Sequence, residues 1–334
     1  MRILAIETSC DETAIAVLSI EDGIFTLEKN LVSSQISTHA QYGGVVPEIA
    51  ARMHTESLPL LLKEALDGPR PDYCAVTAGP GLITSLTTGV NAARALSYSL
   101  GIPLVPVNHI EGHVASNLLE GNAIEYPALA LIVSGGHTEL ISIPEPGHYI
   151  IIGKTRDDAV GEAFDKVAKI LGLPYPGGPA VSKCAEMGDA KSISLPRPMI
   201  ESNDCDFSFS GLKTAVRYLS EEERSRVDDV CASFQDACVD VLVSKTLRAL
   251  RTTGARTLLF GGGVTANRAL RSAFTETMSR DFPMIPFYFP SLSYCTDNAA
   301  MIAAAAYGII TRGAIPPASS WKPNPQWHID EPLV

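Results

Sequence analysis

Two histidines four positions apart are the first residues in this sequence whose spacing points to chemistry. In His109-Ile-Glu-Gly-His113 the imidazoles stand at i and i+4, which on a helix share one face within reach of a single metal ion. Such a pair is also common as plain surface histidines, so the spacing alone leaves both interpretations open. Glu111 lies about 200° round the helix from His109, whereas His113 returns to about 40°. Glu111 therefore points away from the ion, unlike the base of a His-Glu-x-x-His zinc protease.

An aspartate far along the chain is the candidate for a third ligand. Asp297 stands in Cys295-Thr-Asp-Asn298, where a polar turn enters a long apolar helix, a position that also suits an N-cap residue. If it instead completes a His, His, Asp set, open coordination positions make the site catalytic rather than structural. Imidazole and carboxylate ligands suit both zinc and iron.

Two glycine-rich turns could bind a nucleotide. Ser134-Gly-Gly-His-Thr138 and Gly261-Gly-Gly-Val264 each follow an apolar run typical of a strand. Glycine lets backbone amides approach a phosphate or an adenine ring closely, because it has no side chain. Tight turns also use glycine for conformational reasons alone. The equivalent places of the two turns in an internal repeat favour the binding interpretation.

A third polar segment is acidic. Asp157-Asp-Ala-Val-Gly-Glu-Ala-Phe-Asp165-Lys166 predicts a helix with an acidic first turn. Acids at that place interact favourably with the helix dipole and are often simply solvated. Glu162 and Asp165 could instead face a cleft and bind hydroxyl groups.

The elements that must position these residues form a repeat. Apolar periodicity predicts strands at residues 2–6, 13–18 and 25–32, followed by helix 47–66, strand 74–78, helix 82–100 and strand 104–107. After a helix at 109–119 the pattern starts again, with strands at 126–133, 139–143 and 149–152. Helices at 157–171, 227–252 and 265–278, a strand at 257–260 and a buried helix at 299–310 complete the prediction.

Two βββαβα halves, each opening with a hairpin that has a polar turn, are the plan of the actin, sugar-kinase and Hsp70-ATPase (ASKHA) superfamily. We therefore predict an α/β, two-lobed fold with nucleotide in the cleft between the lobes. Residues 1–108 and 309–334 are expected to form one lobe, and 109–308, with the metal-ligand helix, the other. The irregular residues 174–206 are expected to be an insertion in the second lobe.

The overall charge limits how such a protein can meet nucleic acid. The 334 residues carry a formal net charge of −11, which excludes coating RNA or anionic membrane by bulk charge. Between Lys245 and Arg280, however, lie seven basic residues and one acid, Glu276. This basic cluster is either a solvated helix face or a local surface for RNA.

Composition and the cysteines indicate a globular, cytoplasmic protein. Apolar residues make up 46% of the chain against 19% charged, which is enough for a packed core. The seven cysteines are scattered without a Cys-x-x-Cys pair, which indicates a reducing compartment. No signal or transit segment is recognisable, so we expect the chain to begin at Met1. The longest apolar stretch, about twelve residues, is shorter than the roughly 18 that cross a bilayer, so no membrane contact is expected.

The motifs, in their order, resemble the tRNA N6-adenosine threonylcarbamoyltransferase family, the TsaD or Gcp proteins, over nearly the whole chain. Ten collinear segments make the resemblance specific. They are Glu7-Thr-Ser-Cys-Asp-Glu-Thr13, Tyr42-Gly-Gly-Val-Val-Pro-Glu48, Thr77-Ala-Gly-Pro-Gly-Leu82, His109-Ile-Glu-Gly-His113, Ser134-Gly-Gly-His-Thr138, Gly161-Glu-Ala-Phe-Asp-Lys166, Tyr175-Pro-Gly-Gly-Pro179, Asp206-Phe-Ser-Phe-Ser-Gly-Leu-Lys213, Gly262-Gly-Val-Thr-Ala-Asn267 and Cys295-Thr-Asp-Asn298. His137, in place of Asn in the Ser-Gly-Gly motif, looks like the bacterial and organellar branch, and bacterial is our interpretation.

The resemblance implies a reaction. Threonylcarbamoyl would pass from threonylcarbamoyl-AMP to the exocyclic amine of the adenosine beside the anticodon, in tRNAs that read codons beginning with A, with release of AMP. It implies one divalent metal ion, Fe2+ or Zn2+, on His109, His113 and Asp297. It also implies a TsaB-like paralogue and a TsaE-like ATPase as partners. The family pattern places the substrate on Ile132, Val133, Ser134, Gly135 and Gly136, with Asp165, Gly178 and Asn267 around the adenylate.

The chemistry assigns one further residue. A weakly nucleophilic aryl amine must attack the carbamoyl carbon, so the site must polarise the carbonyl, hold the anionic leaving group and remove a proton. For the proton we choose Asp11, in the turn of the first hairpin, with Glu12 expected to point elsewhere. The sequence departs from the family pattern at Ser182, where many relatives carry an acid that could bind ribose.

Three alternatives use the same features. A sugar kinase or plain ATPase of this fold would phosphorylate sugars or turn over ATP. A zinc endopeptidase would need an acid in the place that Glu111 does not occupy. A non-catalytic scaffold of a tRNA-modifying complex would not need the His, His, Asp set or Asp11.

Overall fold

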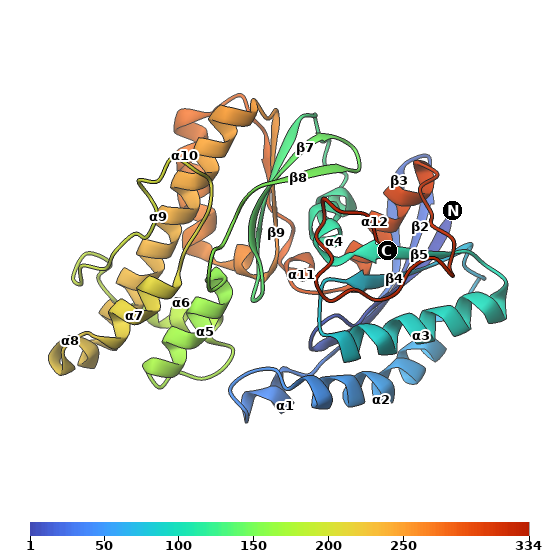
Figure 1. Ribbon diagram of the computed structural model, residues 1–334, viewed down its shortest axis with the longest axis horizontal. Helices are drawn as coiled ribbons and strands as arrows, with labels where there is room; N and C mark the ends of the chain where they lie inside the picture. The colour runs from blue at the N-terminus through green and yellow to red at the C-terminus, as the bar shows by residue number, and fades with distance from the viewer. Residues whose placement is uncertain (334) are drawn as a thin grey trace. The chain divides into compact units, whose positions relative to one another are not determined.

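The computed structural model describes residues 1–333, which form two compact units. Unit 1 contains Met1–Ala123, Pro146–His148 and the chain from Pro290 onwards. Unit 2 contains Ile124–Glu145 and Tyr149–Phe289. Within the described residues, every helix is too short or too polar to cross a bilayer. Figure 1 labels the helices and strands of both units.

Unit 1 is built on a five-stranded mixed sheet. The three N-terminal strands pair antiparallel, and the next two join the edge of the first strand in parallel. The order is β3-β2-β1-β4-β5. The strands are β1 (Arg2–Glu7), β2 (Glu12–Glu21), β3 (Ile24–Ser34), β4 (Tyr73–Gly79) and β5 (Leu104–Asn108).

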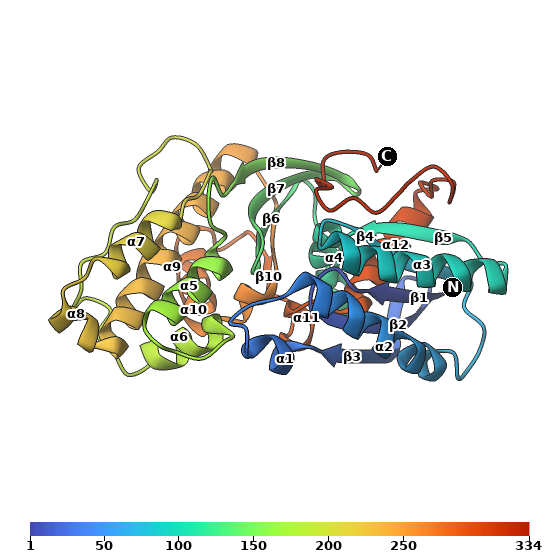
Figure 2. The same cartoon turned by 60° about the horizontal axis from the view of Figure 1, so that its bottom comes forward.

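Helices cover both faces of this sheet, because successive side chains of a strand point to opposite faces. Ile3 and Ala5 pack with helix α12 (Ala299–Thr311), and Leu4 and Ile6 pack with α2 (Pro47–Ala65) and α3 (Ile83–Leu100). Figures 1 and 2 both show α2 and α3 running side by side over the sheet. A run that is apolar on every side, such as α12, is stable only in this buried position. The remaining helices of unit 1 are α1 (Ile36–Ala40), α4 (His109–Ala115), the 3-10 turn η1 (Ser116–Glu120) and α11 (Leu292–Cys295).

Unit 2 repeats the plan on a second five-stranded sheet. Its order, β10-β9-β6-β7-β8, gives the hairpin strands and the parallel strands the same relative places as in unit 1. The strands are β6 (Ala128–Val133), β7 (Thr138–Glu145), β8 (His148–Lys154), β9 (Thr257–Gly261) and β10 (Phe287–Tyr288). The duplication predicted from the sequence is therefore confirmed.

One hydrophobic core joins the sheet of unit 2 to its helices, with Phe164, Phe234 and Phe260 among its buried side chains. The helices are α5 (Val160–Ile170), α6 (Gly177–Ala185), α7 (Ser210–Arg217), α8 (Glu221–Ser225), α9 (Val227–Thr253), the 3-10 turn η2 (Gly263–Ala266) and α10 (Arg268–Asp281). The stretch 174–206, expected to be irregular, contains α6, whose Val181 is buried in this core. The two-residue strand β10 was too short to give a periodic signal.

The unit boundaries differ from the expected lobes. Residues 109–123 and 290–308 belong to unit 1 and not to the second lobe. The reason is packing, since α12 contacts β1, β2 and α4. The helix that carries His109 is thus part of unit 1.

Candidate functional site

Helix α4 starts directly at the end of β5, and Asn108 is its N-cap. The Asn108 Oδ1 accepts hydrogen bonds from the backbone N–H groups of Ile110 at 2.9 Å and Glu111 at 3.3 Å. Its Nδ2 donates to the carbonyl of Trp327 at 3.1 Å, so the C-terminal segment holds the same cap. A capped, fully buried helix of seven residues therefore presents the two histidines from a rigid place.

His109, His113 and Asp297 meet in unit 1. One ligand atom from each lies within 4.8 Å of the others. Oδ1 of Asp297 is 3.4 Å from Nε2 of His109 and 3.3 Å from Nε2 of His113. Metal–ligand bonds of roughly 2.0–2.2 Å at a tetrahedral angle put neighbouring donor atoms about 3.4 Å apart. The cluster could hold a metal ion, and its donor spacing fits one.

His113 gives the strongest sign of a ligand. Its side chain is 0% exposed, and neither ring nitrogen makes a hydrogen bond to the described residues, although Nε2 lies 3.3 Å from Oδ1 of Asp297. An unpartnered buried polar atom costs about 1–3 kcal/mol, so such a side chain needs a compensating interaction. Burial lowers the pKa of His113 more than Asp297 raises it, which favours the neutral imidazole that a metal requires.

His109 is oriented from behind by Glu7. Its Nδ1 lies 3.1 Å from Oε2 of Glu7 and 3.2 Å from Oγ of Ser9, which leaves Nε2 to face Asp297. Glu7 is fully buried and also accepts a hydrogen bond of 2.6 Å from Thr77. A carboxylate behind a histidine ligand fixes the tautomer and raises the basicity of the ligating nitrogen.

The electrostatics of this cluster favour positive charge. Burial alone would lower the pKa of His109, but the charges of Asp297 and Glu7 outweigh it and raise that pKa well above its usual value. Burial would raise the pKa of Asp297, but the two histidines outweigh it and lower that pKa. Carboxylates that stabilise a proton on His109 would stabilise a cation in the same way.

Asp297 is not the N-cap of the apolar helix. Asn298 takes that role, because its Oδ1 accepts the hydrogen bond of Met301 N–H at 3.0 Å. The Asp297 carboxylate is thus left to face the histidines. Glu111 lies outside the cluster, as the helical geometry predicts. It pairs instead with Arg312 at 3.3 Å.

Asp11 lies in the turn between β1 and β2 and is 8% exposed. Its neighbour Glu12 was expected to point elsewhere, but the structure couples it to the same group of acids. Burial, followed by the charges of Asp297 and Asp11, raises the pKa of Glu12 to about 10. Glu12 is therefore a second acid of this region, to which the sequence assigned no role.

In unit 2 the glycine motifs come together around the turn that follows β6. Gly135 and Gly136 are exposed, and a side chain there would meet no atom within 4 Å. A Cβ on Gly161 would lie 2.5 Å from the carbonyl oxygen of Ser134, and one on Gly262 would lie 2.3 Å from that of Val133. Glycine is required where α5 and the turn after β9 approach this backbone. Ile132 and Val133 are fully buried in β6.

Two of the other predicted nucleotide residues, Asp165 and Asn267, hydrogen-bond to α6, the helix that contains Gly178. Asp165 accepts a hydrogen bond of 2.7 Å from the N–H of Gly177, which precedes Gly178 at the start of α6. Asn267 caps α10 through its Oδ1. Its Nδ2 donates to Oγ of Ser182 at 2.8 Å and to Oε1 of Gln235 at 2.7 Å. Ser182, expected as a departure from the family pattern, thus contacts a predicted adenylate residue.

The acidic segment forms a helix with an acid in its first turn, as predicted, but that acid is Glu162. The helix begins at Val160, so Asp157 and Asp158 precede its first turn. Asp158 pairs with Lys166 of α5 at 2.7 Å and with Lys213 of α7 at 2.9 Å, which fastens the segment to both helices.

The basic cluster offers less free charge than its composition suggests. Lys245 is 0% exposed, and its Nζ donates to Ser202 Oγ at 2.6 Å and to Asp204 Oδ1 at 3.1 Å. Arg256 pairs with Glu125 at 2.6 Å. Three further arginines of the cluster also have partners: Arg268 with Glu186, Arg271 with the carbonyl of Thr265, and Arg280 with Asp281. Lys245 is therefore not available to RNA, whereas Arg256, Arg268 and Arg280 lie exposed in ion pairs.

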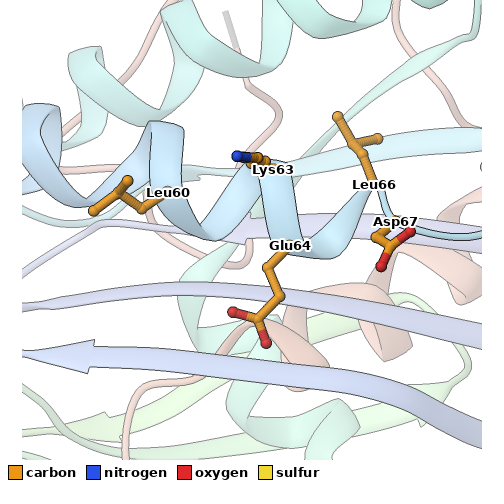
Figure 3. A pocket seen from close by; sticks show the side chains of 5 residues that line it. All are labelled: Leu60, Lys63, Glu64, Leu66 and Asp67. Atoms are coloured by element: carbon orange, nitrogen blue, oxygen red, sulfur yellow. The ribbon is translucent and has the colours of Figure 1, made fainter.

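A shallow depression at the end of α2 is separate from the site residues. Figure 3 shows its lining residues, Leu60, Lys63, Glu64, Leu66 and Asp67. None of them belongs to the metal cluster or to the glycine motifs. A depression of this kind, along one helix and the turn after it, adds nothing to the chemistry of the site.

Two solved structures of low sequence identity resemble this chain in their fold. The crystal structure of full-length HypF in its phosphate- and nucleotide-bound form matches with a TM-score of 0.61 and 14% identity. The match covers 94% of this chain but 47% of HypF, so the chain spans about half the length of that protein. The activator of 2-hydroxyisocaproyl-CoA dehydratase from Clostridium difficile with bound ADPNP matches with a TM-score of 0.52 and 14% identity, over 95% of this chain and 99% of the activator. The chain therefore shares its fold with HypF and with this activator, in agreement with the α/β fold that the sequence predicts.

Sequence relatives are much closer. The tRNA N6-adenosine threonylcarbamoyltransferase of Thermotoga neapolitana is 50% identical over 317 residues, which cover 94% of this chain and 95% of the relative. The protein of the same name from Geobacillus thermodenitrificans is 49% identical, over 93% of this chain and 92% of the relative. The sequence profile of the TsaD family, tRNA N6-adenosine threonylcarbamoyltransferase, matches residues 26–304. With the His, His, Asp cluster intact and the similarity extending through both units, this chain belongs to the TsaD family of tRNA N6-adenosine threonylcarbamoyltransferases.

Proposed function

We propose that this chain transfers the threonylcarbamoyl group from threonylcarbamoyl-AMP to the exocyclic amine of the adenosine beside the anticodon, in tRNAs that read codons beginning with A. The observation that carries the proposal is about 50% identity to relatives named for this reaction over more than nine-tenths of the chain. The reaction forms a bond from the amine nitrogen to the carbamoyl carbon and breaks the bond from that carbon to a phosphate oxygen. AMP leaves as an anion, and the amine loses one proton.

His109, His113 and Asp297 would hold one divalent ion, Fe2+ or Zn2+, since imidazole and carboxylate donors suit both. Such an ion supplies Lewis-acid stabilisation of an oxygen that gains negative charge. Three protein ligands leave coordination positions open, which is typical of catalytic sites. Glu7 fixes the orientation of His109 from behind.

The backbone around Ser134, Gly135 and Gly136, with Ile132 and Val133 before it, would bind the substrate. Because glycine has no side chain, a phosphate or the edge of an adenine ring can approach these backbone N–H groups closely and accept hydrogen bonds from them. Asp165, Gly178 and Asn267 would surround the adenylate, since Gly178 lies in α6 and the other two hydrogen-bond to that helix. Ser182 would take part through the Asn267 amide, in place of the acid of many relatives.

Asp11 would take the proton from the attacking amine or orient that amine. A carboxylate in a tight turn can be placed precisely, because the short backbone between two paired strands has little freedom. Glu12 is the competing candidate, because it is the next acid along the chain. Burial and the charges of Asp297 and Asp11 raise the pKa of Glu12 to about 10, and a carboxyl that already holds its proton cannot take one from the amine, so we choose Asp11 as the base.

The net charge of the chain indicates that it needs partner proteins to bind tRNA well. A chain of net charge −11 binds a polyanionic tRNA poorly, and the basic cluster is largely paired within unit 2. From the family that this chain resembles, we include a TsaB-like paralogue and a TsaE-like ATPase as the partners that complete tRNA binding. A tRNA substrate also makes the cytoplasm the expected compartment.

One experiment tests the function against its alternatives. The purified chain, with and without these partners, is incubated with tRNA and threonylcarbamoyl-AMP, and the tRNA nucleosides are analysed by mass spectrometry. The expected product is threonylcarbamoyl-adenosine, with AMP released in equal amount. Phosphorylated sugar, steady ATP turnover by the chain alone, or cleavage of a peptide in parallel assays would favour a kinase, an ATPase or a peptidase instead.

A further inference from the structure

A chain of buried hydrogen bonds in unit 1 leads from the loop between α1 and α2 to the turn that carries Asp11. The N–H of Val46 donates to Nδ1 of His39 at 3.3 Å, and Nε2 of His39 lies 3.1 Å from Oε1 of Gln35. The Gln35 Nε2 lies 3.3 Å from Nδ1 of His54, and Nε2 of His54 lies 3.0 Å from the carbonyl oxygen of Cys10. The side chains of Gln35, His39 and His54, which form these hydrogen bonds, are each at most 1% exposed.

The two ends fix the direction of every bond. The Val46 N–H can only donate, so Nδ1 of His39 accepts and its Nε2 carries the proton. The amide of Gln35 then accepts at its oxygen and donates from its nitrogen to Nδ1 of His54. The Nε2–H of His54 donates to the Cys10 carbonyl, which can only accept. Both imidazoles are therefore neutral and in the same tautomer.

A branch strengthens this arrangement. The buried hydroxyl of Thr13 lies 2.8 Å from Nδ1 of His54 and donates to it. Burial lowers the pKa of His54, in agreement with a neutral ring. Nδ1 of His54 has one lone pair, which Thr13 and Gln35 share, and the Gln35 amide also donates to the carbonyl of Ala50 at 3.3 Å. These contacts favour the tautomer of His54 that carries its proton on Nε2.

The network ends on both peptide groups of Asp11. The Cys10 carbonyl belongs to the peptide that precedes Asp11, and His54 holds it. The Asp11 carbonyl belongs to the peptide that follows, and the backbone N–H of Gln35 donates to it at 3.0 Å. With both flanking peptides fixed, the direction of the Asp11 side chain from its Cα is fixed as well.

We infer that His54 is a positioning residue for Asp11, acting through the Cys10 carbonyl, and that Gln35 and His39 hold His54 in the tautomer that this task needs. The inference rests on the proposed role of Asp11. Misplacement of a reacting group by about 1 Å can cost roughly 10²-fold in rate, so loss of the Cys10 contact should reduce transfer by about 10- to 100-fold.

Two substitutions of His54 separate this role from simple packing. His54→Gln places an amide nitrogen near the place of Nε2 and can still donate to Cys10, but loses the acceptor for Thr13. His54→Asn keeps an acceptor near the place of Nδ1 and loses the bond to Cys10. We expect kcat for transfer to fall about 10- to 100-fold in His54→Asn and to stay within a few-fold in His54→Gln. The KM values and the metal content should be unchanged in both, and His328→Asn, at an exposed histidine, is the matched control.

A double-mutant cycle tests whether His54 acts through Asp11. If it does, His54→Asn causes no further loss in an Asp11→Asn background, because the group that it positions is already gone. Equal losses in the two backgrounds would overturn the inference, as would the same activity for His54→Asn and wild type.

A second measurement does not depend on activity. Nitrogen-15 NMR of the histidine side chains should show His39 and His54 as neutral rings protonated at Nε2, whereas a ring of His54 protonated at Nδ1 refutes the network. Absence of transfer by the wild type with its partners would refute the proposed function, and normal transfer by Asp11→Asn would refute the role of Asp11. Each failure is thus distinguishable from failure of the His54 inference.

Discussion

The carboxylate of Glu7 allows the metal centre to be tested without touching a ligand. Its Oε2 accepts from Nδ1 of His109 and from the Thr77 hydroxyl, and its Oε1 accepts from the backbone N–H of Ser9. All three neighbours are donors, so both oxygens are needed. Burial would raise the pKa of Glu7, but His109 outweighs burial and lowers it, so the group is ionised at neutral pH.

The substitution Glu7→Gln keeps the shape of the side chain but changes two quantities, the folding free energy and the metal affinity. The amide oxygen can replace Oε2 and keep His109 and Thr77, but the amide nitrogen then faces the N–H of Ser9. An unpaired buried donor costs about 1–3 kcal/mol of folding free energy. Loss of the negative charge behind a histidine ligand weakens metal binding by about 10- to 100-fold, the usual effect of removing such a partner.

The assay is a competition titration with zinc and a chromophoric chelator at pH 7, together with urea unfolding of the metal-free protein. Glu111→Gln is the matched control, because this acid lies on the same helix as His109 but pairs with Arg312. The control should bind zinc as the wild type does. Wild-type zinc affinity in Glu7→Gln would refute the reasoning that the carboxylate supports the ligand.

Four further results are expected. His109→Ala and Asp297→Ala should each lose most of the metal but keep the fold, because a three-ligand site contributes less to folding than a closed one, as elemental analysis and thermal melts can check. Asp11→Asn should lower transfer by about 10²-fold with unchanged metal content, whereas Asp22→Asn, in the exposed turn after β2, should not; a loss of only a few-fold would make Asp11 structural. Burial raises the pKa of Asp158, but two lysines outweigh it and lower that pKa, so the stability that it contributes is present above about pH 4 and is lost as the pH falls through the lowered value. Urea titrations at pH 7 and pH 3 should show a smaller difference for Asp158→Asn than for wild type. Binding of tRNA by the chain alone should be weak and steeply salt-dependent, and tighter with partners, so tight binding at physiological salt would contradict the charge argument.

Local pattern was sufficient for the fold and for much of the chemistry. Apolar runs located both hairpins, because a strand that is covered on both faces, such as β1 or β6, is apolar along its whole length. The spacing of His109 and His113 placed two imidazoles on one helix face, and that is a property of the helix alone. The ten motifs were enough to identify the family, since they are collinear along the chain.

The sequence could not decide which of several possible roles a side chain has when its neighbours in the sequence fit each role equally well. Asp297 and Asn298 both suit an N-cap, and the structure assigns the cap to Asn298. The basic cluster looked like a surface, but Lys245 is buried against Asp204, which lies 41 positions away in the sequence.

What only the tertiary structure decided are partnerships across long stretches of sequence. Glu7 supports His109 from 102 positions away, and His54 reaches Cys10 from 44 positions away. No periodicity records such pairs, because they depend on how two elements pack and on which buried donors and acceptors must then be satisfied. Residue types and spacing along the chain therefore determined which groups were available for chemistry, and packing decided which of them act together.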